Sequence, residues 1–97
     1  MKDFTNKSIN ANYRKGAQTY VGILCFYSDE FEYKVKAVNT TIKLGKIPYS
    51  EIKSIKPVST FGIVPNGIII KLKNGAEYNY IISNRNSVIK FLEIKMK

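Results

Sequence analysis

The chain has 97 residues, one Cys and no His, and its 16 Lys and Arg residues against seven Asp and Glu residues give a formal net charge of +9. This length fits one domain. A single cysteine excludes an internal disulfide and a thiolate metal cluster within one chain, and the lack of histidine removes the usual near-neutral acid–base group. We therefore expect no enzyme, no metal and no cofactor.

The positive charge is Lys-rich and spread along the chain, with Arg only at positions 14 and 85. Specific phosphate or base recognition favours Arg because its planar guanidinium binds two oxygens at once. The pattern therefore favours diffuse attraction to polyanions. The polar start does not fit a signal peptide, and no apolar run of about eighteen residues occurs. We expect a cytoplasmic protein in which Cys25 is a buried thiol.

The beginning of the chain is mostly polar. We expect residues 1–11 to form an N-terminal arm with disorder at its start, and residues 12–97 to form the single domain. A first strand is predicted over residues 12–15, and the chain is predicted to turn at Gly16.

The next segments alternate as strands do. Residues 18–27 carry apolar side chains on both faces, which is typical of a central strand, and Gly22 within them predicts a bend or a bulge. Residues 31–36 alternate with one polar and one apolar face. Two further strands are predicted, one starting at residue 42 and one over residues 52–58.

A hairpin is predicted from residues 68–72 to residues 76–82. A two-residue loop at Asn74-Gly75 would mix polar and apolar faces across the hairpin. A three-residue loop over residues 73–75, with Gly75 at positive φ, keeps the faces separate, so we prefer it. The preferred register pairs Leu72 with Ala76, Ile70 with Tyr78, Ile68 with Tyr80, and Lys71 with Glu77.

After Ile82 the period becomes helical. Asn84 is the preferred N-cap residue, and Val88, Leu92 and Met96 follow at helical spacing. About seven short strands and one terminal helix indicate a mainly β (α+β) fold. We expect a seven-stranded antiparallel bent barrel or sandwich that one C-terminal helix caps.

Several segments together resemble a known family. They are residues 22–24 (GIL), 29–33 (DEFEY), 47–55 (IPYSEIKSI), 61–68 (FGIVPNGI), 75–80 and 84–85. In order and spacing they resemble the GRAM domain, a member of the pleckstrin-homology (PH)-like superfamily, over about residues 12–95. The resemblance implies a PH-like or GRAM-like domain. It also implies a binding role, for membrane lipids or proteins, without catalysis.

One departure from the superfamily concerns the ligand. Phosphoinositide-binding relatives often carry a basic residue near the first hairpin and a Lys/Arg-x-Arg pattern in the second strand. Here Arg14-Lys15 precede the turn, but Gln18-Thr19-Tyr20 follow it. We therefore expect no tight inositol phosphate site, since a fold does not specify a ligand.

Two candidate surfaces follow. The predicted anion-binding or membrane-facing side chains are Arg14, Lys15, Lys34, Lys36, Lys43 and Lys46; a solvated face is the simpler reading of such lysines. The predicted contact for a protein partner is an apolar loop tip formed by Phe61, Ile63 and Val64, which could equally pack on the core.

Two alternatives stay open. Interleaved Tyr and Lys residues could stack on bases, as in a small basic nucleic-acid-binding β-barrel, although aromatic residues at strand alternation more simply fill a core. A strand edge near Pro48 could also pair with a second copy of the chain. The preferred interpretation is a non-enzymatic interaction module that binds a protein partner or, weakly, an anionic membrane surface.

Overall fold

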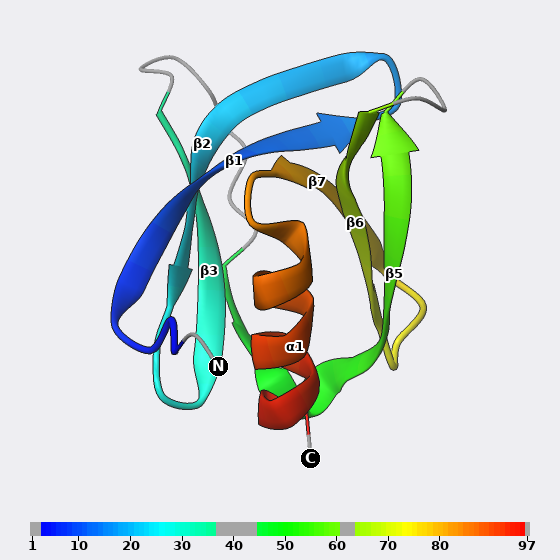
Figure 1. The fold of residues 1–97 in the computed structure, drawn as a ribbon. Helices are drawn as coiled ribbons and strands as arrows, with labels where there is room; N and C mark the ends of the chain where they lie inside the picture. Colours follow the sequence, from blue (N-terminus) through cyan, green and yellow to red (C-terminus); the bar gives the residue numbers. More distant parts are fainter. Residues whose placement is uncertain (1–2, 37–44, 61–63, 97) are drawn as a thin grey trace.

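The computed structural model describes residues 3–36, 45–60 and 64–96. Their strands form one antiparallel sheet in the order β4-β3-β2-β1-β7-β6-β5, which curls into a half-barrel around the C-terminal helix (Figure 1). This confirms the expected architecture. The elements are β1 (Lys7–Lys15), β2 (Gln18–Phe26), β3 (Glu30–Val35), β4 (Lys46–Pro48), the 3-10 helix η1 (Tyr49–Glu51), β5 (Ile52–Thr60), β6 (Val64–Leu72), β7 (Glu77–Ile82) and α1 (Arg85–Lys95).

The start of the sheet differs from the expectation. β1 begins at Lys7 and pairs with β2 from there, so residues 7–11 belong to the domain and not to a separate arm. The physical reason is Phe4, which is buried with its ring centroid 5.9 Å from that of Phe26 and 5.5 Å from that of Phe91. This apolar anchor holds the chain against the core before the strand starts.

The β6–β7 hairpin has the predicted register. Ile70 lies opposite Tyr78 and Lys71 opposite Glu77. The N–H of Gly75 donates to the carbonyl of Leu72 at 3.0 Å, and Gly75 has a φ of 94°. The three-residue loop is therefore confirmed, and it needs glycine because positive φ is costly for residues with a Cβ.

Strand β4 is short, and η1 follows it directly. The strand predicted to begin at residue 42 starts outside the described residues. β5 runs from Ile52, as predicted, and extends to Thr60 with breaks in register between Ile52 and Ser54 and between Val58 and Thr60.

Helix α1 covers one end of the half-barrel. Val88 and Leu92 are fully buried, and Phe91 packs its ring on that of Phe26 with centroids 5.3 Å apart. Asn84 occupies the N-cap position as predicted, but its φ is 56° and its side chain makes no capping hydrogen bond. The helix is thus anchored by its apolar stripe more than by a side-chain cap.

Candidate functional site

Three of the predicted basic residues lie on the outer face of the sheet. Arg14, Lys34 and Lys36 alternate with residues that point inward, such as Tyr13 and Tyr33. They come from the two strands that flank β2: Lys34 of β3 pairs with Ile23 of β2, and Arg14 of β1 pairs with Thr19. Lys36 follows β3 directly, and its N–H donates to the carbonyl of Val21. We call Arg14, Lys34, Lys36, Val21 and Ile23 the outer basic face.

Val21 lies in the middle of the outer basic face. It is 57% exposed, which is unusual for a β-branched apolar residue in a central strand. The outer basic face therefore combines cations with an apolar centre, a combination that suits contact with another surface.

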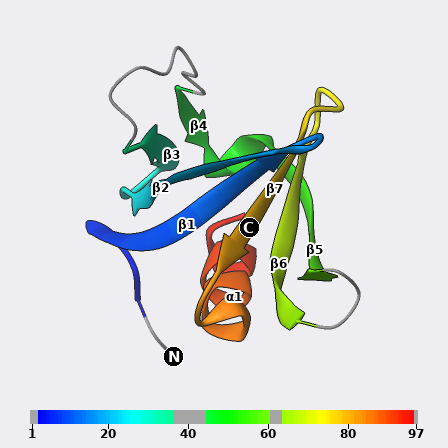
Figure 2. The ribbon, with the colours of Figure 1, turned by 90° about the horizontal axis from the view of Figure 1, so that it is seen from above.

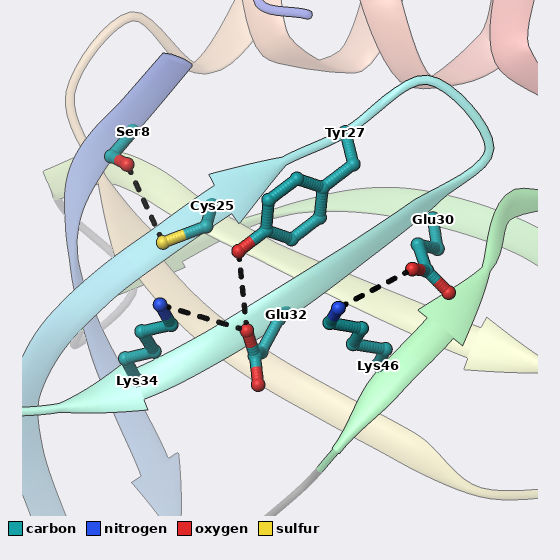
Figure 3. Close-up of polar contacts among 7 residues, drawn as sticks. All are labelled: Ser8, Cys25, Tyr27, Glu30, Glu32, Lys34 and Lys46. Atoms are coloured by element: carbon teal, nitrogen blue, oxygen red, sulfur yellow. Dashed lines mark hydrogen bonds and ion pairs between the residues drawn. The ribbon is translucent and has the colours of Figure 1, made fainter. Parts of the chain in front are cut away.

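Two of the predicted lysines have acidic neighbours (Figure 3). Lys34 Nζ lies 3.8 Å from Glu32 Oε1, and Lys46 Nζ lies 3.8 Å from Glu30 Oε1. The Tyr27 hydroxyl also donates to Glu32 Oε1, at 3.3 Å. Such exposed pairs contribute little stability, but they reduce the local positive charge near β4.

The other predicted site residues are scattered. Lys15 is exposed at the end of β1, before the turn at Gly16. Lys43, Phe61 and Ile63 lie outside the described residues. Val64 opens β6 and is 45% exposed. Lys46 lies on β4 opposite Glu32, which separates it from Lys34 of the outer basic face.

A hollow of about 300 Å³ lies where β1 and β7 separate. Its lining residues are Asn10, Ala11, Asn12, Asn66, Ile81, Ile82 and Ser83. Lys36 Nζ reaches its margin and donates to Asn10 Oδ1 at 3.3 Å. The sequence pattern did not predict this hollow, although Asn10 and Asn12 share one face of a strand and could have indicated a polar site.

Three buried tyrosine rings pack together inside the half-barrel. Tyr80 has its ring centroid 5.5 Å from that of Tyr13 and 5.3 Å from that of Tyr33. Burial raises the pKa of Tyr13 and of Tyr33, and raises the pKa of Tyr80 well above its ordinary value. These phenols stay neutral at physiological pH and act as core, which confirms the simpler interpretation of the aromatic residues.

The described part of the chain has few other side chains that could bind a metal ion or react. There, no three His, Cys, Asp or Glu side chains gather closely enough to hold a metal ion. Cys25 is buried and accepts a hydrogen bond from the Ser8 hydroxyl at 3.4 Å. None of the helices in these residues is long and apolar enough to cross a membrane.

Comparison with known proteins identifies the fold. No protein-family profile matches the chain. A stretch of 59 residues, 61% of the chain, is 37% identical to the chloroplastic protein Vascular associated death 1 of Arabidopsis thaliana, and it spans 8% of that protein's length.

Solved structures match nearly the whole chain. The C-terminal domain of an unknown protein from Leishmania infantum has a TM-score of 0.77 and 18% identity, over 93% of this chain and 81% of that one. The PH domain of Slm1, in complex with inositol-4-phosphate, has a TM-score of 0.64 and 12% identity, over 96% of both chains. The seven antiparallel strands and the C-terminal helix of this chain therefore form a PH-like fold.

Proposed function

We propose that this chain is a non-enzymatic, GRAM-like interaction module that associates weakly with anionic membrane surfaces through its outer basic face. The observation that carries the proposal is the grouping of Arg14, Lys34 and Lys36 around the exposed Val21 on adjacent strands. The solved complex of the Slm1 PH domain with inositol-4-phosphate supports it, because a domain of similar fold binds an anionic ligand there. The order and spacing of the GRAM-like segments support the family assignment.

The expected attraction is weak and does not distinguish headgroups. Each basic side chain near an anionic bilayer contributes about 1 kcal/mol, and salt screens this contribution. Arg14 is the single Arg of the outer basic face, so a planar, bidentate phosphate site is not part of the proposal. The module would then sit at the membrane periphery and dissociate readily.

Sedimentation with lipid vesicles tests the proposal. Vesicles rich in phosphatidylserine or phosphatidylglycerol should retain the protein equally at low ionic strength. They should release it near physiological salt, where the Debye length is about 8 Å. A protein that fails to bind either vesicle at low salt would rule the proposal out.

Two matched triple variants test whether the outer basic face or the net charge of the protein causes vesicle binding. Changing Arg14, Lys34 and Lys36 together to Gln should abolish retention. Changing the exposed Lys53, Lys73 and Lys90 to Gln removes the same charge elsewhere and should leave most retention intact. Equal loss in both triple variants would mean that net charge alone is responsible.

The nucleic-acid alternative has less support. A groove-reading helix would expose a basic face, whereas α1 buries Val88, Phe91 and Leu92. Tyr13, Tyr33 and Tyr80 are buried and offer no face for stacking on bases. Salt-resistant binding to one single-stranded oligonucleotide, measured beside the vesicles, would favour the alternative.

A further inference from the structure

The first part of strand β1 has a neighbouring strand on one side only. The strand pairs with β2 from Lys7 to Lys15, but its pairing with β7 covers only Ala11 to Arg14. Residues 7–10 of β1 therefore pair with a strand on one side only, and β1 runs on beyond the end of β7, where the chain turns into α1 (Figure 2). The N–H of Lys7 already donates to the carbonyl of Phe4, so the open part of this edge is residues 8–10. An unpaired strand edge presents N–H and C=O groups that another extended chain can pair with.

The hollow between β1 and β7 opens beside this edge. Asn10, Asn12 and Asn66 line it together with Ser83. The amides of Asn10 and Asn12 carry donors and acceptors that match the N–H and C=O groups of a peptide. Ile81 and Ile82 add apolar surface to the lining.

The charged side chain at the hollow is basic, and Glu32 on the same outer face pairs with Lys34. None of its lining residues is acidic, and Lys36 Nζ lies at its margin, 3.3 Å from Asn10 Oδ1. Arg14 and Lys34 lie on the same outer face, on β1 and β3. An acidic chain would be attracted here, whereas a basic one would be repelled.

The two outermost edges of the sheet are less suited to pairing. β4 has three residues and ends at Pro48, and β5 contains Pro57 and two breaks in register. Proline lacks the N–H that a ladder needs, and short or irregular edges resist pairing. This makes the β1 edge a better place for a strand to add than the predicted edge near Pro48.

We propose that the hollow between β1 and β7 is the docking site for an extended, acidic segment of a partner protein, which pairs with residues 8–10 of β1 through main-chain hydrogen bonds. This mode is β-strand addition, in which main-chain bonds supply affinity and neighbouring side chains supply selectivity. The site is additional to the proposed membrane contact. A bilayer surface has no peptide N–H groups to pair with a strand edge, so either proposal can fail without the other.

Three blocked hexapeptides test the docking site on the whole, ¹⁵N-labelled chain. The first peptide alternates Glu and Val, and the second alternates Lys and Val. The third has the sequence of the first with N-methyl groups on alternate residues, which keeps its charge but removes main-chain N–H donors. The first should shift the amide signals of residues 7–12 and 81–83 and slow hydrogen exchange in residues 8–10. The other two should bind at least about tenfold more weakly.

A matched pair of variants tests the hollow itself. Asn10→Asp places a negative charge at its margin and should weaken the Glu–Val peptide about tenfold. Asn10→Ser keeps a neutral polar group and should bind within about threefold of the unchanged chain. Equal binding of the N-methylated peptide would overturn strand addition. So would shifts confined to β5.

Discussion

The hydroxyl oxygen of Tyr33 lies 2.6 Å from the point where a Cβ on Gly22 would stand. It also lies 2.9 Å from the carbonyl oxygen of Ala11 and 3.0 Å from that of Tyr20, so its single proton can donate to one of these at a time. The tyrosine crosses β2 at its glycine and reaches the backbone of β1. A bend or a bulge was predicted at Gly22; the register runs through it without a shift, so there is no bulge, and the glycine allows the close approach.

Gly22→Ala should therefore destabilise the fold by about 1–3 kcal/mol, because the new methyl group overlaps both the Tyr33 side chain and the backbone carbonyl of Lys34. Urea unfolding followed by circular dichroism measures the change. Thr19→Ala, at an exposed position of the same strand, is the control and should stay within about 0.5 kcal/mol. If Gly22→Ala behaves like that control, the close approach is incorrect.

Removing the hydroxyl of Tyr80 and removing that of Tyr33 should change the stability of the fold in opposite directions. The Tyr80 hydroxyl is buried without a hydrogen-bond partner among the described residues, so Tyr80→Phe should stabilise the fold by about 1 kcal/mol. Tyr33→Phe removes a made hydrogen bond and should destabilise by a similar amount. Thermal unfolding of both variants decides the point, and destabilisation by Tyr80→Phe would show that its hydroxyl is paired.

The β6–β7 loop gives a third prediction. Gly75 has a φ of 94°, and a Cβ there would meet no atom within 4 Å, so any cost of substitution is conformational. Gly75→Val should cost more than about 1 kcal/mol, because β-branched residues resist positive φ. Gly75→Asn should cost less, since Asn tolerates that region. Equal costs in denaturant unfolding would argue against a backbone cause.

The helix gives a fourth prediction. Leu92 is fully buried, so Leu92→Ala should cost about 2–5 kcal/mol, and removal of residues 84–97 should leave the chain unfolded. Glu93→Ala, at the next and exposed position, should be nearly neutral. A truncated chain that keeps its near-ultraviolet circular dichroism would mean that the sheet does not need α1.

High pH should unfold the protein through its tyrosines. Burial raises the pKa of Tyr13, Tyr33, Tyr49 and Tyr80 above the ordinary value of 10.0. The unfolded chain then loses these protons first, so stability is complete below pH 10 and falls as pH rises above it. The urea midpoint should drop over that range together with the appearance of tyrosinate absorbance. Tyr80→Phe, which has one buried phenol fewer, should lose less stability over the same pH range. A urea midpoint of the unchanged protein that does not fall above pH 10 would contradict the burial of these tyrosines.

The sequence by itself determined the local elements. Alternation defined the inward and outward faces of the strands, so the outward positions of Arg14, Lys34 and Lys36 could be anticipated. Separation of polar and apolar faces fixed the register of the β6–β7 hairpin and the positive φ of Gly75, because a slip of one residue exchanges the two faces. The periodicity of residues 88–96 placed the helix and its buried stripe.

Only the tertiary structure decided which strands are neighbours and where they part. Pairing of β1 with β7 joins residues about 70 positions apart, and the alternation of polar and apolar residues within a strand does not predict which distant strand pairs with it. The end of that pairing at Ala11 creates the asparagine-lined hollow, which no local pattern outlines. The same holds for Gly22, whose role appears only when the side chain of Tyr33 crosses it from the next strand.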